Sequence, residues 1–461
     1  MAQPDTTTSA EAPDPNGAEP GAGVPLRTLL AYAPPVVALS SPLFMVQFYF
    51  LNFATDVLLL APLGVGVLFA AGRVWDAVSD PIVGTLSDRT RTRLGRRRPW
   101  MLAGIPLLMV SLLMIWRPPE MSTGPQYAWL ALALFTFYSA FTMFSVPHSA
   151  LGAELSTDHH DRNRIFGTQA AAFTFGMMIA FGGMQYVTNA AVPREAAAQL
   201  VTVAIFVLPW ILVIPPTLLR ERAEYQGRGA ASSLGAMRDV LKNPHARLLL
   251  TAQFIQLMGS AVLGVMAPYL MRYVLKRPDL IGVMPALFVL CTMLSIPIWI
   301  RLTRRFGKRN CWITGMIGSG LSFGMILFIQ ENDFLMMGCV LASAGFFVGC
   351  GMMVGNSILA DVIDWDELET GERKEGAYSA AWGFAIKTAN AIVIVAVSAA
   401  LQFSDFRPNE EQTEGTLLMF RVFNGGIPLV MFLLGAFWFR RFELNESEHA
   451  EIRAELDRRA A

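Results

Sequence analysis

Two carboxylates and one arginine interrupt an apolar stretch in the first quarter of the chain. Asp76 and Asp80 are four residues apart and Arg73 precedes Asp76 by three, so a helix would present all three side chains on nearly one face. A charge near the middle of a bilayer costs about 2.5–3.5 kcal/mol, so three charges in one segment require an explanation. Two carboxylates at this spacing make a hard oxygen site suited to sodium, or a site that traps a proton. A purely structural Arg73–Asp76 ion pair is the alternative, and it leaves Asp80 unmatched.

The second half of the chain carries one clearly deep ionisable group, Lys387, near the middle of an apolar stretch over 375–403. A lysine at mid-helix is badly placed to reach the membrane surface, so we expect it to face a cavity and to pair with the two aspartates or with a substrate. Structural snorkelling is the alternative. We assign Arg73, Gln169 and Trp382, together with Lys387, to substrate binding or gating, although polar side chains in such spans also bridge helices.

The other reactive side chains indicate no catalytic chemistry. His148 is expected to be a packing residue, and Asp158–Asp161 a solvated turn rather than a metal cluster. The four cysteines have no paired spacing and are expected to be small buried hydrophobes: Cys291, Cys311, Cys339 and Cys350. No Gly-x-x-x-x-Gly-Lys-Ser/Thr, His-Glu-x-x-His or Gly-x-Ser-x-Gly motif occurs. The sequence therefore predicts neither an enzyme nor ATP-driven transport, and no cofactor or metal beyond a coupling cation.

Membrane helices are the elements that must position these side chains. Of the 461 residues, 54% are hydrophobic and 16% charged, against about 45–50% and about 25% in soluble proteins. The 36 basic residues equal the 36 acidic ones, so net charge offers no attraction to nucleic acid. Apolar runs of about 20 residues predict twelve transmembrane helices. We expect them at about 29–54, 61–87, 98–116, 126–154, 165–188, 199–219, 247–273, 279–301, 311–330, 334–361, 375–403 and 418–440.

The basic loops predict both the orientation and an internal repeat. With the N-terminus inside, most Lys and Arg fall in the inner loops, so both termini are expected to be cytoplasmic. The loop 89–98 has a shorter copy at 301–309, and aligning Gly95 with Gly307 superposes basic residues before and after each glycine. Two six-helix halves in parallel repeat, with a substrate cavity between them, are typical of the major facilitator fold. We therefore expect an all-α integral membrane protein of this fold.

The expected organisation has five parts. Residues 1–26 are rich in Ala, Pro, acidic and hydroxyl residues, which indicates a disordered cytoplasmic tail rather than a signal peptide. The N-terminal six-helix half spans 27–220, a polar cytoplasmic connector spans 221–246, and the C-terminal half spans 247–441. Residues 442–461 are expected to form an amphipathic cytoplasmic tail helix.

Motifs spread over nearly the whole chain resemble the glycoside–pentoside–hexuronide:cation symporters, the family of the melibiose permease. They are Thr55-Asp56-Val57, Arg73-x-Trp75-Asp76-x-x-x-Asp80-Pro81, Ser87-Asp88-Arg89-Thr90-Arg91, Gly95-Arg96-Arg97-Arg98-Pro99-Trp100, Pro147 with Glu154, Ala360-Asp361-x-x-Asp364 after the tenth helix, Arg373-x-Glu375-Gly376, and Lys387. The resemblance implies that the two aspartates of the second helix, here Asp76 and Asp80, coordinate the coupling cation.

The chain departs from the melibiose permease pattern at the sugar-gripping positions. The carboxylates expected in the first and fourth helices are replaced by Ser40 and Ser145, and the arginine expected in the fifth falls near Gln169. A galactoside site of that design is therefore absent. Ser145 could still offer a hydroxyl to a cation held by Asp76 and Asp80.

These features together predict a secondary symporter of the bacterial-type inner membrane. It would move a sugar, glycoside or uronide inward with sodium or a proton by alternating access, functioning as a monomer. Because Arg73 and Lys387 balance the two aspartates, a bound cation would leave the site about one charge positive, and an anionic or zwitterionic substrate would restore neutrality. A cation-coupled transporter of lysolipids or other amphiphiles is the alternative, and a non-transporting receptor is a weaker one. A lateral apolar opening would favour lipid, and a closed polar cavity would favour sugar.

Overall fold

The computed structural model describes residues 24–156, 159–219, 221, 240–372, 374–444 and 446–460, and this part of the chain is helical, with no strand. The helices before residue 221 are α1 (Leu26–Tyr32), α2 (Pro34–Asn52), the π-turn η1 (Phe53–Val57), α3 (Pro62–Arg89), α4 (Arg98–Trp116), α5 (Thr123–Glu154), α6 (His159–Asn189), α7 (Pro193–Leu212) and α8 (Ile214–Leu218). Those after it are α10 (Pro244–Tyr269), the π-turn η3 (Leu270–Val274), η4 (Pro278–Leu280), α11 (Val283–Phe306), α12 (Lys308–Gly324), η5 (Met325–Phe328), α13 (Phe334–Thr370), α14 (Glu375–Phe403), α15 (Glu414–Arg421), the π-turn η6 (Val422–Gly426), α16 (Ile427–Phe439) and α17 (Glu446–Ala460).

The fold class is confirmed as a helical membrane protein. Within the described residues, eleven helical stretches are long and apolar enough to cross a membrane. The expected helix over 61–87 is present as the 28-residue α3, but it is not among those eleven. The apolar sequence of α3 is interrupted by Arg73, Asp76 and Asp80, so the count of twelve transmembrane helices stays a prediction. The orientation of the two termini also stays a prediction.

The structure corrects some of the expected boundaries. The tenth predicted helix does not end at 361, because α13 continues to Thr370. Asp361 and Asp364 therefore lie in the helix and not after it. Asp161 is not in a solvated turn: it lies in the first turn of α6, it is buried, and its Oδ1 accepts a hydrogen bond from the backbone N–H of Val24 at 3.0 Å.

Some expected features fall on residues outside the described part. Residues 1–23 of the expected tail over 1–26 and residues 222–239 of the expected connector over 221–246 belong to them, as do Asp158 and Arg373. The four cysteines carry no disulfide, and Cys311 and Cys350 are buried as expected, whereas Cys339 is exposed. The described residues hold no cluster of three metal-ligating side chains.

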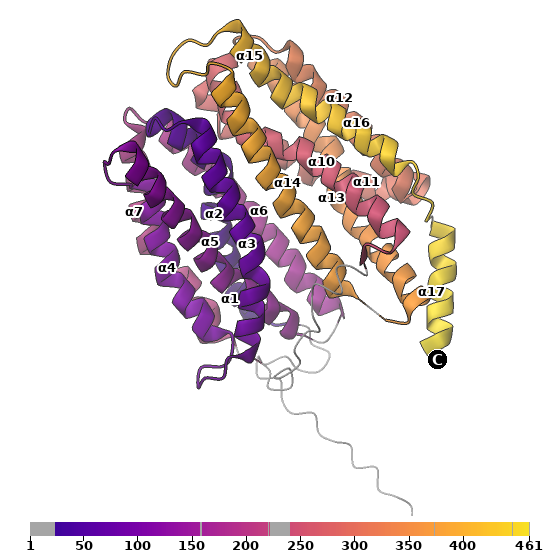
Figure 1. The fold of residues 1–461 in the computed structure, drawn as a ribbon. Helices are drawn as coiled ribbons and strands as arrows, with labels where there is room; N and C mark the ends of the chain where they lie inside the picture. Colours follow the sequence, from indigo (N-terminus) through magenta and orange to yellow (C-terminus); the bar gives the residue numbers. More distant parts are fainter. Residues whose placement is uncertain are drawn as a thin grey trace, which may run out of the picture.

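The helices form two groups that lie side by side (Figure 1). In the first group α2 packs on α6, and α5 packs on both α3 and α4; in the second, α13 packs on α11 and α12, while α10 packs on α14 and α16. The groups meet mainly along α3 and α14, and also where α2 contacts α10 and α6 contacts α11. Gly66 shows how close α3 and α14 are, since a Cβ there would lie 2.1 Å from the Ser398 hydroxyl. The seam between α3 and α14 therefore brings the charged segment of α3 against Lys387.

Candidate cation and substrate site

The aspartates of α3 and the lysine of α14 form one ionic cluster across the seam. Lys387 Nζ lies 2.9 Å from Asp76 Oδ2 and 2.6 Å from Asp80 Oδ2, and it also donates to the Asp76 carbonyl at 3.1 Å. One ammonium therefore bridges both carboxylates, which are one helical turn apart on the same face of α3. The structure thus brings Lys387 against two aspartates that lie more than 300 positions earlier in the sequence.

Arg73 completes the cluster from within α3. Its guanidinium lies 3.7 Å from Asp76 Oδ2 and 5.6 Å from the centre of the Tyr138 ring, and the residue is buried. Gly72 permits this packing, because a Cβ there would meet the Tyr138 ring at 2.9 Å. The Arg73–Asp76 ion pair that we considered as a structural alternative exists, but Asp76 also shares Lys387 with Asp80.

Thr142, a hydroxyl that the sequence did not single out, contacts both carboxylates. Thr142 Oγ1 on α5 donates to Asp80 Oδ1 at 3.0 Å and lies 3.5 Å from Asp76 Oδ1, and Ser79 lies 3.1 Å from Thr142. Ser145, the expected hydroxyl, is three residues from Thr142, and within the described residues it makes no hydrogen bond to either aspartate. The spacing of one helical turn from Ser145 was the signal that could have pointed to Thr142.

The three charged side chains that meet at the seam differ in their exposure to solvent. The side chain of Asp76 is 5% exposed, that of Lys387 21% and that of Asp80 38%. A small cation would therefore reach Asp80 first and find carboxylate oxygens, the Thr142 hydroxyl and a competing ammonium. The four formal charges of Arg73, Lys387, Asp76 and Asp80 cancel, so the site is neutral without a bound ion.

Gln169 and Trp382, the other expected substrate contacts, have partners elsewhere. Gln169 Oε1 accepts a hydrogen bond from the Tyr32 hydroxyl at 3.0 Å, and the Tyr32 ring stacks on His148 at 4.4 Å. The Trp382 ring packs over Gly355, where a Cβ would lie 3.3 Å from it. Both side chains are partly exposed, but the contacts described here do not join either to the charged cluster.

A groove of about 530 Å³ follows the seam between α3 and α14. Its lining is Arg73, Val74, Ala77, Val78, Phe384, Lys387, Thr388, Ala391, Ile392 and Val395. Val74 and Phe384 are more than half exposed, and the walls are almost entirely apolar. The groove therefore combines a largely apolar lining with two cationic residues, Arg73 and Lys387.

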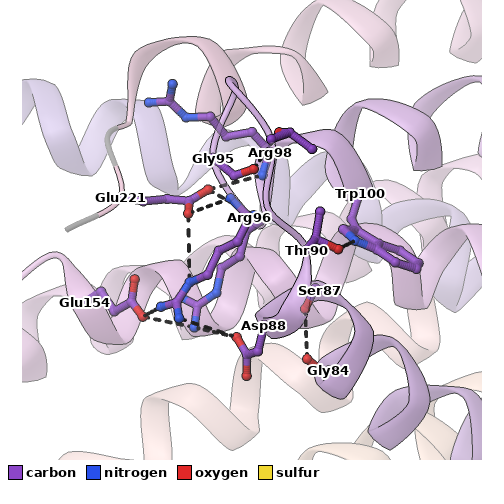
Figure 2. A network of polar contacts seen from close by, with 12 residues as sticks. Gly84, Ser87, Asp88, Thr90, Gly95, Arg96, Arg98, Trp100, Glu154 and Glu221 are labelled. Carbon is purple, nitrogen blue, oxygen red and sulfur yellow. Dashed lines mark hydrogen bonds and ion pairs between the residues drawn. The ribbon is translucent and has the colours of Figure 1, made fainter. Parts of the chain in front are cut away.

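The basic loop between α3 and α4 is held by carboxylates (Figure 2). Arg96 and Arg97 both contact Glu154, Arg97 at 2.9 Å, and Arg97 also lies 3.4 Å from Asp88. Burial raises the pKa of Glu154, and the neighbouring Arg97 and Arg96 oppose that rise. Ion pairs with Asp88 and Glu154 thus hold the basic loop between α3 and α4 in place.

Glu221 is a functional candidate that sequence reasoning missed. Its carboxylate accepts the backbone N–H groups of Arg96 and Arg97, both at 3.0 Å, and of Arg98 at 3.3 Å. It therefore caps the first turn of α4 with a negative charge, as a helix N-terminus favours. Gly95 has φ +104°, a backbone conformation that favours glycine, and a Cβ there would lie 2.6 Å from Glu221 Oε1, so the carboxylate would have to shift to admit a side chain.

Comparison with known proteins places the chain among transporters. Residues 31–446 match the family described as "MFS/sugar transport protein". The sodium-dependent lysophosphatidylcholine symporter 1 of Mus musculus is 25% identical over 90% of this chain and 84% of its own length. The glucuronide carrier protein homolog of Escherichia coli (strain K12) is 24% identical over 94% of this chain and 96% of its own length.

Solved structures agree with this fold. The nucleoside transporter NupG superposes with a TM-score of 0.66 at 11% identity, covering 90% of this chain and all of that one. A bacterial homologue of the human drug peptide transporters PepT1 and PepT2 superposes with a TM-score of 0.60 at 13% identity, covering 89% of this chain and 97% of that one. At these identities the likeness is one of fold alone.

Proposed function

The chain belongs to the MFS/sugar transport protein family, and from that premise we propose that it is a symporter that couples sodium or proton entry to an organic substrate bearing an anionic or zwitterionic group. The observation that carries the proposal is the Lys387 ammonium, which bridges Asp76 and Asp80 across the seam between the two groups of helices. Transporters of this family are not enzymes, and no catalytic role is assigned to these residues.

Cation binding at the aspartates would act on the seam itself. A sodium ion or proton at Asp76 and Asp80 competes with Lys387 for the same oxygens, so it weakens the ionic contact between α3 and α14. The freed Lys387, with Arg73, then offers two positive charges to a substrate. Binding of the cation and of the substrate is thereby mutually reinforcing, which is what coupling requires. Thr142 is the hydroxyl best placed to join the cation site, and Ser145 stays a predicted contributor one turn away.

Charge decides part of the substrate class. The neutral cluster gains one positive charge with a cation, and an anionic group on the substrate removes that charge from a poorly solvated site. Uronides meet this requirement, in line with the glucuronide carrier homolog among the relatives. A lysophospholipid head group meets it too, in line with the lysophosphatidylcholine symporters.

The groove favours the amphiphile. An acyl chain needs an apolar channel, and the walls of the α3–α14 groove supply one directly beside Arg73 and Lys387. A sugar ring is bound more often by several hydrogen-bonding side chains, and the groove lining has only Thr388 besides the two cationic residues Arg73 and Lys387. We therefore propose, from the geometry of the groove, an amphiphile with an anionic or zwitterionic head group as the first candidate substrate. A sugar, glycoside or uronide is the second candidate, from the description of the family.

The remaining expectations belong to the same proposal. We propose two six-helix halves over 27–220 and 247–441, both termini in the cytoplasm, a bacterial-type inner membrane as the location, inward transport and function as a monomer. Gln169 and Trp382 are proposed as substrate or gating residues away from the charged cluster.

Thermal stability of the purified protein tests the proposal and separates the substrate classes. Glycosides, uronides and lysolipids would each be added with and without sodium and at several pH values, to the parent chain and to Asp76→Asn. A ligand present at 100 times its dissociation constant adds about 2.7 kcal/mol, which is enough to raise the melting temperature visibly. We expect one class to stabilise the parent in a cation-dependent way, with the cation dependence lost in Asp76→Asn. Stabilisation that is independent of both sodium and pH in the parent would contradict symport.

A further inference from the structure

A second charged cluster joins the two groups of helices away from the proposed cation site. It surrounds Asp56, at the end of the first membrane-spanning stretch, on the face that carries the loops 58–61, 275–282 and 404–413; we call this the 58–61 face. The Asp56 side chain has no exposed surface, although it carries a carboxylate. A buried charge of this kind persists only where donors satisfy it.

The donors come from both groups of helices. From its own segment, Asn52 donates to the Asp56 carboxylate at 3.3 Å and Thr55 at 2.9 Å. From the other group, the Tyr273 hydroxyl donates at 2.7 Å and the Arg272 guanidinium lies 3.6 Å away. The shortest of these hydrogen bonds and the ion pair with Arg272 thus both cross between the groups.

Neighbouring hydrogen bonds reinforce this crossing. Asn409, in the loop after α14, donates to the Asp56 carbonyl at 2.9 Å through its side chain and to the Tyr273 hydroxyl at 3.0 Å through its backbone. Thr55 and the Tyr269 hydroxyl lie 2.8 Å apart. The rings of Tyr273 and Phe406 are 5.4 Å apart and close over the cluster from the second group. Separating the groups here would strip Asp56 of its charged and phenolic donors and leave only Asn52 and Thr55.

The two backbones that meet at Asp56 are built alike. The π-turn η1 ends in the hydrogen bonds Leu58 N–H to Phe53 and Leu60 N–H to Ala54, and η3 ends in the same pattern, Leu275 N–H to Leu270 and Arg277 N–H to Met271. Each turn is followed by a non-glycine residue in the left-handed region, Leu59 with φ 55° and Lys276 with φ 53°. Asp56 and Tyr273 are the fourth residues of their respective turns. The 2.7 Å hydrogen bond therefore joins equivalent positions of the internal repeat.

We propose that Asp56, Arg272, Tyr273 and Asn409 form a latch that holds the 58–61 face closed and must break for that face to open. Paired π-turns suit such a role, because they break the regular helical hydrogen-bond ladder at the point where each helix must bend. The inference rests on the proposed symport, for which we expect the two faces to open in turn, but it concerns residues outside the proposed cation and substrate site.

Distance measurement between spin labels tests the latch without any ligand. Labels at Ala61→Cys and Glu414→Cys, in a chain whose four native cysteines are replaced, report the separation of α3 from α15 on the 58–61 face. Asp56→Asn removes the charge and keeps the shape, while Asp405→Asn removes an exposed carboxylate on the same face as the matched control. Tyr273→Phe keeps the Asp56 carboxylate but removes the hydroxyl that donates to it and accepts from the Asn409 backbone, and it serves if Asp56→Asn does not fold.

We expect Asp56→Asn and Tyr273→Phe each to shift the ratio of long to short distances about tenfold toward the long one, as the loss of a hydrogen bond to a charged group implies. Asp405→Asn should leave the distribution unchanged. Unchanged distributions in folded Asp56→Asn and Tyr273→Phe would overturn the latch. Failure of cation coupling in transport would overturn the proposed function and leave the distance result standing.

Discussion

Substitution of Lys387 tests whether a cation can replace its ammonium group beside Asp76 and Asp80. Lys387→Ala leaves Asp76 and Asp80 one turn apart, with Arg73 beside Asp76 as the nearest remaining cation. Truncating one partner of a fully buried ion pair costs about 3–5 kcal/mol. Because the Asp80 side chain is 38% exposed, we expect about 2–3 kcal/mol here, after that range is reduced for solvent screening.

The informative part of this prediction is that the loss can be reversed by the coupling cation. Sodium or a proton takes the place of the ammonium, so saturating cation should return most of the lost stability, about 2.7 kcal/mol at 100 times its dissociation constant. The assay is the melting temperature of purified Lys387→Ala across sodium concentrations at high pH, and across pH without sodium. Lys308→Ala is the matched control, since Lys308 also lies 2.6 Å from a carboxylate, that of Asp361 on α13.

The control variant should lose stability without gaining cation dependence. The reasoning is refuted if the melting temperature of Lys387→Ala responds to sodium and pH no more than that of Lys308→Ala does. Such a result would mean that the aspartates do not attract a cation once the ammonium is gone.

Three further predictions follow from contacts around the site. Thr142→Val removes the hydroxyl that donates to Asp80, so the cation affinity measured from thermal stabilisation should fall about tenfold, whereas Ser145→Ala should change this affinity little. The opposite result, a large loss only in Ser145→Ala, would indicate that Ser145 and not Thr142 contributes to the cation site. Gly95→Ala places a side chain on a backbone with φ +104° and against the Glu221 carboxylate, so its melting temperature should fall by the equivalent of about 1–2 kcal/mol, while that of Gly124→Ala, where a Cβ meets nothing within 4 Å, should not; equal effects would show that position 95 does not require glycine. Ala391→Phe fills the groove and should abolish stabilisation by lysolipids while sparing that by uronides, and equal loss of both would show that the groove does not select an acyl chain.

Much of the helical framework was predictable, because hydrophobic length fixes it. The helices expected at 98–116 and 375–403 match α4 and α14 end to end. The end of α13 could not be read from hydropathy, since the apolar run stops near 361 while the helix continues through acidic residues. Those residues are satisfied by other elements, as Asp364 is by His449 of α17 at 3.0 Å.

The ionisable residues of the candidate site could be predicted from the sequence. Arg73, Asp76, Asp80 and Lys387 stood out because ionised groups in an apolar span need partners, and the structure joins them. Thr142 escaped notice because a threonine in a long helix more often donates to its own backbone, as Thr136 does to Leu132. Glu221 escaped because its partners are backbone groups more than 120 residues away, a contact that leaves no sequence pattern.

Substrate accumulation in proteoliposomes tests directly whether Asp76 and Asp80 couple the cation to the substrate. The parent chain, Asp76→Asn and Asp80→Asn would each be reconstituted, and uptake of the substrate class that stabilises the parent would be followed under imposed sodium and proton gradients. We expect the parent to concentrate the substrate under one of the two gradients, and both variants only to equilibrate it. Accumulation by both variants to the level of the parent would contradict a coupling site at Asp76 and Asp80.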